Sequence, residues 1–201
     1  MAGDGARVPF VGLTGGIGAG KSEALSALER LGAATLSTDA VVHELYQSDE
    51  LRDALVERFG EEVAPGGSID RSAVASRVFE QPEQREWLEG RLWPGVGRRV
   101  WAWRQEQERR DPPPKAMVVE VPLLFEAGMD EVFDSTIAVV ADEAVRNERA
   151  EARGHEGLAS RTSRQLSQAE KAQRADFVVE NDGTLEELRE KMSRLLERIG
   201  A

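Results

Sequence analysis

The chain has 201 residues, a length that accommodates one domain with a substantial core and a small inserted lobe. Its 26 lysines and arginines against 37 aspartates and glutamates give a formal net charge of −11, which argues against a broad nucleic-acid-binding or anionic-membrane surface. The absence of cysteine excludes disulfides and thiolate metal sites, and no apolar run approaches the length of a membrane span. The first residues lack the basic and apolar regions of a signal peptide, so we expect a cytoplasmic protein.

The first predicted elements are a buried strand at residues 8–14 and a helix at residues 22–31 that ends before Gly32. Residues 15–22 between them have the spacing of a phosphate-binding loop, Gly, four residues, Gly-Lys-Ser. Its glycines allow several backbone N–H groups to point at one anion, and the following helix adds its positive end. Lys21 is expected to reach the β- and γ-phosphates of a nucleotide, and the Ser22 hydroxyl to ligate Mg²⁺. The candidate nucleotide-binding residues of the loop are Gly15, Gly16, Ile17, Gly18, Ala19, Gly20, Lys21 and Ser22.

Short β-branched, apolar runs predict four further strands. They lie at residues 34–38, 116–121, 135–141 and 176–179. Charged segments with helical periodicity separate them, which is typical of a parallel sheet covered by helices. The sequence therefore predicts an α/β protein with three layers, in which a five-stranded parallel sheet lies between helices.

Residues 39–114 contain no convincing strand and are interpreted as a helical lobe inserted between the second and third strands. The single domain would then have a core of residues 8–38, 115–145 and 175–201, and a helical lid at residues 146–174. Within the lobe, one apolar face is predicted from helical spacing. That face consists of Leu88, Leu92, Val96, Val100 and Trp103. Pro94, Gly95 and Gly97 interrupt the same segment, so we expect a kinked or broken helix there.

The chain is predicted to close with an amphipathic helix at residues 184–199, with Thr184 as its N-cap. The expected buried side of this helix consists of Leu185, Leu188, Met192, Leu195, Leu196 and Ile199.

Polar side chains follow the predicted strands, and the ends of parallel strands gather at one edge of a sheet, where ligands bind. The residues concerned, besides the phosphate loop, are Asp39, Glu120, Glu126, Asp142 and Asn181–Asp182–Gly183. Asp39 has two interpretations of about equal weight, a carboxylate that takes a proton from an acceptor hydroxyl and a helix N-cap. His43, one turn further on the same face, either contacts the acceptor, orients the Asp39 carboxylate, or is a surface or partly buried histidine.

Arg146, Arg149 and Arg153 recur at spacings of three and four, hence on one side of a helix. Such a row can close over triphosphate oxygens, or it can be a solvated face paired with neighbouring glutamates.

Further along the chain, residues 122–126 form the run Pro-Leu-Leu-Phe-Glu, which is far more selective than the phosphate loop, since that loop occurs in many NTPases. Other notable features are Arg149 with Arg153, Arg161 with Gln165, Ala175–Asp176–Phe177 followed by Asn181–Asp182–Gly183, and Ile69–Asp70–Arg71 with Val78–Phe79. Together with the phosphate loop, these motifs resemble the dephospho-CoA kinase family over nearly the whole chain.

The resemblance implies a P-loop NTPase fold and transfer of the γ-phosphoryl group of ATP to the 3′-hydroxyl of dephospho-CoA, with Mg²⁺, giving CoA and ADP. Asp39 aligns with the family's expected general base, and Lys21, Arg149 and Arg153 complete the expected catalytic set. Asn181 corresponds to an adenine-side contact. The candidate acceptor-binding residues are His43, Arg71, Trp93 and Glu126. The expected partners are ATP and dephospho-CoA, with no nucleic acid or membrane, and the expected state is a monomer or a weak homo-oligomer.

This sequence departs from the family pattern at several positions. Ser37 and Thr38 stand where Asp and Ala are usual, and Glu120 stands for an Asp, a replacement that could still hold a metal-bound water. Glu23 follows the loop, where its backbone N–H can still bind phosphate. Trp93 replaces a frequent histidine and is interpreted as packing in the lobe with Trp87, Trp101 and Trp103 in preference to stacking on an acceptor base. These departures leave two alternatives, a kinase of another nucleoside or hydroxyl acceptor and a catalytically silent ATP-binding sensor.

Overall fold

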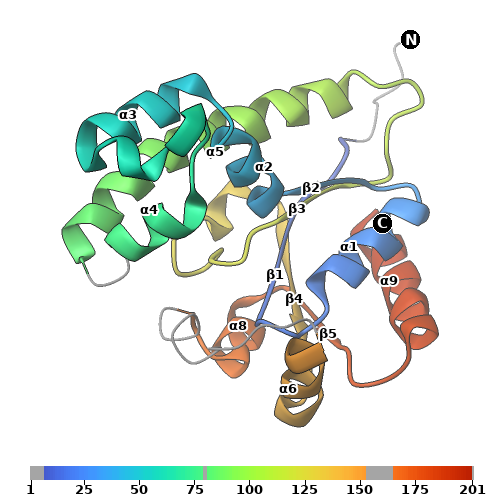
Figure 1. Cartoon of the computed structure of the whole chain (residues 1–201). Coiled ribbons are helices and arrows are strands. Elements are labelled where there is room, and N and C mark those ends of the chain that lie inside the picture. The colour runs from blue at the N-terminus through green and yellow to red at the C-terminus, as the bar shows by residue number, and fades with distance from the viewer. Residues whose placement is uncertain (1–6, 79–80, 153–164, 201) are drawn as a thin grey trace. The chain divides into compact units, whose positions relative to one another are not determined.

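The computed structural model describes residues 7–78, 81–152 and 165–200. Five strands form one sheet in which every pairing is parallel, in the order β2-β3-β1-β4-β5 (Figure 1). The strands are β1 (Phe10–Gly15), β2 (Ala34–Ser37), β3 (Met117–Glu120), β4 (Ser135–Val140) and β5 (Phe177–Glu180). The prediction of a five-stranded parallel sheet in an α/β protein is confirmed, and each strand lies within two residues of its predicted position.

The chain divides into two compact units, which we describe separately. Met1–Ser37 and Arg104–Ala201 form the core unit, and Thr38–Trp103 forms the helical unit. The helical unit ends earlier than the lobe expected at residues 39–114. The guanidinium of Arg104 stacks 4.5 Å from the ring centre of Phe10 on β1, which ties the following residues to the core unit.

One face of the sheet is covered by α1 (Lys21–Arg30) and α9 (Leu185–Ile199), which lie side by side (Figure 1). Apolar side chains from both helices and from alternate positions of the strands form a buried cluster there, which includes Leu13, Leu28, Ile137 and Met192. Thr184 caps α9 and exchanges hydrogen bonds with Glu187 in a capping box, as predicted for this N-cap.

Leu185 was expected on the buried side of α9 and is 47% exposed, so that part of the prediction is wrong. It is the first helical residue, and the packed turns of α9 begin at Leu188.

The opposite face of β1 carries Phe10, Gly12 and Thr14, because side chains alternate along a strand. Phe10 packs against Phe133 at 4.8 Å between ring centres, and a Cβ on Gly12 would collide with Leu124 and Phe133. In chain order, β4 is followed by α6 (Glu143–Ala152) and then by α8 (Gln168–Arg174). The second of these helices, α8, contacts β1 and β4. The sheet is thus covered on both faces, in agreement with the three predicted layers.

The helical unit contains α2 (Thr38–Leu45), α3 (Asp49–Phe59), α4 (Arg71–Val78) and the larger part of α5 (Pro82–Glu108). Two short 3-10 turns, η1 (Glu61–Val63) and η2 (Pro65–Gly67), connect α3 to α4, and η3 (Asp130–Val132) precedes β4 in the core unit. The unit has its own apolar cluster, formed by Leu51, Leu55, Val63, Val74 and Leu88. None of the helices in the described residues is long and apolar enough to span a membrane.

Of the two predicted alternatives at Pro94, the broken helix is wrong, since α5 runs without interruption through this residue. Proline removes one backbone hydrogen bond, and burial of the apolar face on both sides of Pro94 supports the helix across that defect. Gly95 has a packing role, because a Cβ at this position would lie 3.0 Å from Cδ1 of Leu45 on α2.

Trp103 is buried as expected, and Trp87 packs partly against the apolar cluster. Trp93 is 39% exposed and Trp101 is 58% exposed, so these two rings are covered less than Trp103 is.

Candidate active site

Residues 15–22 connect β1 to α1 and form a tight turn that is closed by hydrogen bonds to its own backbone. The Ala19 N–H donates to the Gly16 carbonyl at 3.2 Å, and Nζ of Lys21 donates to the same carbonyl oxygen at 3.3 Å. α1 begins at Lys21, so the positive N-terminal end of this helix faces the turn. A helix N-terminal end with an ammonium group beside it is the arrangement expected of an anion-binding cradle.

Two glycines of the loop are required by its neighbours. Gly18 has φ 77°, and a Cβ there would approach the Arg146 carbonyl oxygen on α6 to 2.5 Å. Gly20 has φ 93°, and a Cβ there would overlap the side-chain amide of Asn181. The loop is therefore enclosed by α6 and by the segment between β5 and α9, and side chains at these two positions are excluded.

Asn181 joins the end of the sheet to the phosphate loop. Its backbone N–H donates to the Val140 carbonyl at 2.8 Å, and its buried side-chain amide donates to the Ala19 carbonyl at 2.8 Å. The predicted adenine-side residue thus also supports the predicted phosphate loop.

The arginines of α6 lie on the same side of the core unit as the loop. Nη1 of Arg149 donates to the Asn181 carbonyl at 2.8 Å, and Nη2 lies 3.5 Å from the Gly183 carbonyl. Nη1 of Arg146 lies 3.0 Å from the point where a Cβ on Gly16 would be, and its Nε is buried with no hydrogen-bond partner among the described residues. Arg153 lies outside the described residues.

Glu126 is held inside the core unit. Its Oε1 lies 3.0 Å from Nζ of Lys171 and accepts a hydrogen bond from the Leu166 N–H at 2.8 Å. Its Oε2 is buried, and the described residues offer it no hydrogen-bond partner. Burial lowers the pKa of Lys171, and the carboxylate of Glu126 opposes that shift in part.

Lys171 and Gln168 were missed by the sequence reasoning. Both lie on α8, and Gln168 binds both backbone groups of Ala141, accepting from its N–H at 3.0 Å and donating to its carbonyl at 2.7 Å. A local signal existed, because Ser167 and Glu170 have the spacing of a capping box, and the structure shows that box. It places positions 168 and 171 three apart on one face of a short helix.

Glu120 ends β3 and is only 6% exposed, in register with Leu13 on one side and Ser37 on the other. Ser22 lies in the first turn of α1, next to Lys21. The described residues contain no group of three or more carboxylates and histidines that could hold a metal ion. The donors in this region are the Ser22 hydroxyl and the Glu120 carboxylate. Such a small set fits Mg²⁺, which retains several waters and takes few protein ligands when it is bound through a nucleotide.

In the helical unit, Asp39 lies within the first turn of α2 and is exposed. The helix begins at Thr38, so the alternative in which Asp39 precedes the helix as its N-cap is wrong. Nη1 of Arg71 on α4 lies 3.0 Å from Nδ1 of His43, which must accept since guanidinium only donates.

The same Arg71 guanidinium stacks 5.3 Å from the ring centre of Tyr46. Burial raises the pKa of Tyr46, and Arg71 offsets part of the increase. Two predicted acceptor contacts, His43 and Arg71, are thus brought together, whereas Trp93 lies on α5 with its side chain partly exposed.

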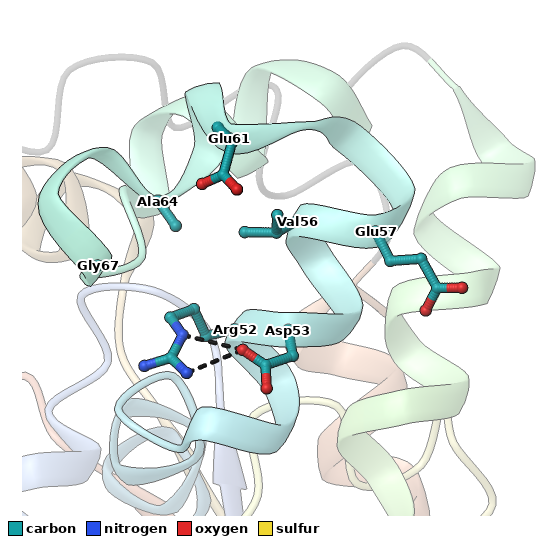
Figure 2. A pocket seen from close by; sticks show the side chains of 7 residues that line it. All are labelled: Arg52, Asp53, Val56, Glu57, Glu61, Ala64 and Gly67. Atoms are coloured by element: carbon teal, nitrogen blue, oxygen red, sulfur yellow. Dashed lines mark hydrogen bonds and ion pairs between the residues drawn. The ribbon is translucent and has the colours of Figure 1, made fainter.

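The helical unit also has an open surface hollow of about 370 Å³ (Figure 2). It is lined by Arg52, Asp53, Val56, Glu57, Glu61, Ala64 and Gly67. Arg52 lies against Asp53, to which it donates two hydrogen bonds (Figure 2). No candidate site residue lines this hollow, so it is not part of the candidate active site.

Comparison with known proteins points to one family. A family model described as dephospho-CoA kinase matches residues 9–187. A dephospho-CoA kinase of Protochlamydia amoebophila is 36% identical over 194 residues, which cover 94% of this chain and 95% of the relative. A crystal structure from Thermus thermophilus has a TM-score of 0.78 at 32% identity, covering 95% of this chain and 97% of that chain. The dephospho-CoA kinase from Campylobacter jejuni, at 23% identity with the same coverage, has a TM-score of 0.65 and shows the likeness of the fold.

Proposed function

Because this chain belongs to the dephospho-CoA kinase family, it is an ATP-dependent kinase of dephospho-CoA, and we propose that Lys21 and Asp39 carry its chemistry. The observation that supports this most is the cradle of residues 15–22, with the Lys21 ammonium beside it. The Asp39 carboxylate is exposed, and no hydrogen bond or ion pair engages it within the part of the chain that the structure describes.

On the nucleotide side, backbone N–H groups of residues 15–23 and the N-terminal end of α1 bind the phosphates. Lys21 exchanges its hydrogen bond to the Gly16 carbonyl for the β- and γ-phosphate oxygens. Arg149 and Arg153 neutralise charge on the transferred group, and Arg146 joins them from its place beside Gly16. Asn181 supports the loop and contacts the adenine side.

Ser22 ligates Mg²⁺ through its hydroxyl in this proposal, and Glu120 holds one of the metal-bound waters. Bound there, the metal would supply positive charge that offsets the negative charge of the phosphates. The burial of Glu120 at the end of β3 supports its role, since a carboxylate there is positioned by the sheet.

Asp39 acts as the general base in the transfer. It accepts the proton of the acceptor 3′-hydroxyl while that oxygen forms a bond to the γ-phosphorus. The bond from the γ-phosphorus to the bridging oxygen of ADP breaks, and ADP leaves with that electron pair. The protonated carboxyl then returns its proton to solvent.

The acceptor is held mainly by residues of the helical unit, with Glu126 of the core unit as a further contact. Arg71, oriented by His43 and Tyr46, supplies a fixed positive charge for the diphosphate of dephospho-CoA. Trp93 offers a partly exposed aromatic ring to an acceptor base. Glu126 has only Oε2 to contribute, because Oε1 binds Lys171 and Leu166.

The proposed partners are the small molecules ATP and dephospho-CoA, and the proposed location is the cytoplasm, where ATP is supplied. The net charge of −11 disfavours nucleic acid as a further partner. We propose a monomer or a weak homo-oligomer, which sedimentation of the purified chain tests.

The decisive experiment combines Mg-ATP with dephospho-CoA and measures the addition of one phosphoryl group by mass spectrometry. The wild-type chain is expected to form CoA, and Lys21→Ala is expected to form none above background. Asp39→Asn should lower kcat by about 10²- to 10⁴-fold while the KM for ATP stays within about twofold. Glu44→Gln, a carboxylate change on the same helix, is the matched control. An Asp39→Asn variant with wild-type kcat would show that Asp39 is not the general base. If the wild-type chain phosphorylates other hydroxyl acceptors but not dephospho-CoA, the proposed acceptor is wrong.

A further inference from the structure

Lys171 is a fully buried lysine that the proposed chemistry does not use. Its side chain is 0% exposed, and its ammonium has three oxygen partners. Nζ lies 2.6 Å from the Pro122 carbonyl, 3.0 Å from Oε1 of Glu126 and 3.3 Å from Oγ1 of Thr14. An ammonium group has three N–H donors, so each has an acceptor. A buried charge is costly unless it is paired in this way, and a hydrophobic residue would fill the same space without that cost.

The partners of Lys171 belong to segments that are far apart in the sequence. Thr14 directly precedes Gly15, the first residue of the phosphate loop. Pro122 is two residues beyond Glu120, the proposed holder of a metal-bound water. The Thr14 hydroxyl also donates to the Pro122 carbonyl at 3.3 Å, so the two segments and the ammonium form one connected group.

The position of Lys171 is set from a second direction. Gln168, on the same helix, binds the N–H and the carbonyl of Ala141 at the end of β4. Glu126 is itself fixed by the Leu166 N–H, which precedes the helix. The ammonium is therefore presented by a helix whose place on the sheet does not depend on Lys171 alone.

We propose that Lys171 is a positioning residue, whose ammonium holds the start of the phosphate loop and the segment after Glu120 at the separation that a metal-bound nucleotide requires. The inference rests on the proposed roles of these two segments. This role differs from a purely structural one, because replacing both Lys171 and Glu126 together is expected to leave folding intact and to weaken nucleotide binding. Arg174 also reaches this region, with its guanidinium 6.0 Å from the Phe125 ring centre, whereas the Lys171 ammonium is hydrogen-bonded to both Thr14 and Pro122.

The test uses the full chain with Lys171→Met and Glu126→Gln combined. The double variant leaves no unpaired charge, and the amide oxygen introduced at position 126 can still accept from the Leu166 N–H. We expect an unfolding midpoint in urea close to wild type, and an ADP dissociation constant and a KM for ATP raised about tenfold or more. Lys191→Met is the matched control, because Lys191 donates to the Glu180 carbonyl from an exposed position.

Wild-type ADP affinity in a folded double variant would overturn the proposal. If the double variant does not fold, Lys171→Arg decides, since it keeps the charge but presents its donors in a planar fork. It should weaken ADP binding about fivefold or more, and unchanged affinity would equally overturn the proposal. ADP binding is measured by calorimetry without the acceptor, so a wrong assignment of the acceptor leaves this test intact.

Discussion

The side-chain amide of Asn181 donates a 2.8 Å hydrogen bond to the backbone carbonyl of Ala19, across 162 positions of the sequence. Asn181 is 5% exposed, so neither group has ready access to water. The same amide occupies the space that a side chain on Gly20 would need. The shape of the phosphate loop therefore depends on a residue from the far end of the chain.

Asn181→Ala is expected to raise the KM for ATP about tenfold. The Ala19 carbonyl would lose a buried hydrogen-bond partner, which costs about 1–3 kcal/mol, and the loop would no longer be held against its neighbours. Steady-state kinetics with each substrate varied in turn measures the effect. The KM for dephospho-CoA should stay within about twofold, and Glu180→Gln, an exposed change next in sequence, should leave both constants unchanged. Equal increases in both KM values would contradict the role assigned to Asn181.

Arg146→Met is expected to weaken ATP binding by about three- to tenfold. Nη1 of Arg146 lies beside Gly16, and its buried Nε has no hydrogen-bond partner within the described ranges, so the group is available to a phosphate oxygen. Methionine keeps much of the packing of the side chain without the charge. Calorimetric titration with ATP and with AMP provides the measurement. The loss should be large for ATP and small for AMP, and a similar loss for both nucleotides would point to packing alone.

Gly97→Ala is expected to stabilise the chain by about 0.5–1 kcal/mol. Gly97 is exposed in the interior of α5, and a Cβ there meets no atom of the described residues within 4 Å, so only the conformational cost of glycine is removed. Gly95→Ala, two residues earlier, should be less stable than Gly97→Ala by about 1 kcal/mol or more, because its Cβ would press on Leu45 at 3.0 Å. Urea unfolding of the two variants gives the comparison, and equal midpoints would show that α5 and α2 are not closely packed at Gly95.

The burial of Lys171 predicts a rise in stability with pH. Its pKa in the folded chain is below the ordinary value of 10.5, chiefly because of desolvation. Between the two values the unfolded chain binds the additional proton, so the free energy of unfolding rises with pH across that window and levels off above about 10.5. Urea unfolding from about pH 8 to 10.5 should therefore show wild type gaining stability relative to the Lys171→Met, Glu126→Gln variant. The Lys191→Met variant provides the reference curve, and a difference that does not change with pH would be inconsistent with a lowered pKa for Lys171.

Local patterns were sufficient to predict several elements. The Gly-rich turn before Lys21 and Ser22, the apolar strand before it and the helix after it are all encoded within about twenty residues, and the structure shows each of them. The same holds for α9, whose cap at Thr184 and apolar spacing are properties of one helix. Alternation of strands with helices also indicated a parallel sheet, because a parallel connection needs a crossover segment.

The errors have a common cause, which is packing between distant segments. Pro94 and its neighbouring glycines indicate a break when α5 is considered alone, but the burial of its apolar face supports the helix through them. Leu185 fits the apolar spacing of α9, yet the packed part of that helix begins one turn later.

By itself the sequence determined the phosphate loop, the strands, the class of fold and the family, since these depend on residues close together in the chain. Only the tertiary structure decided that Lys171 is buried, that Glu126 is its partner, and that Asn181 shapes the loop between β1 and α1. Lysine is ordinarily exposed and its partner lies 45 positions away, so no local pattern identifies the pair. Its environment exists only after β1, β3 and α8 have come together, because a charge is paired or solvated according to what the folded chain places around it.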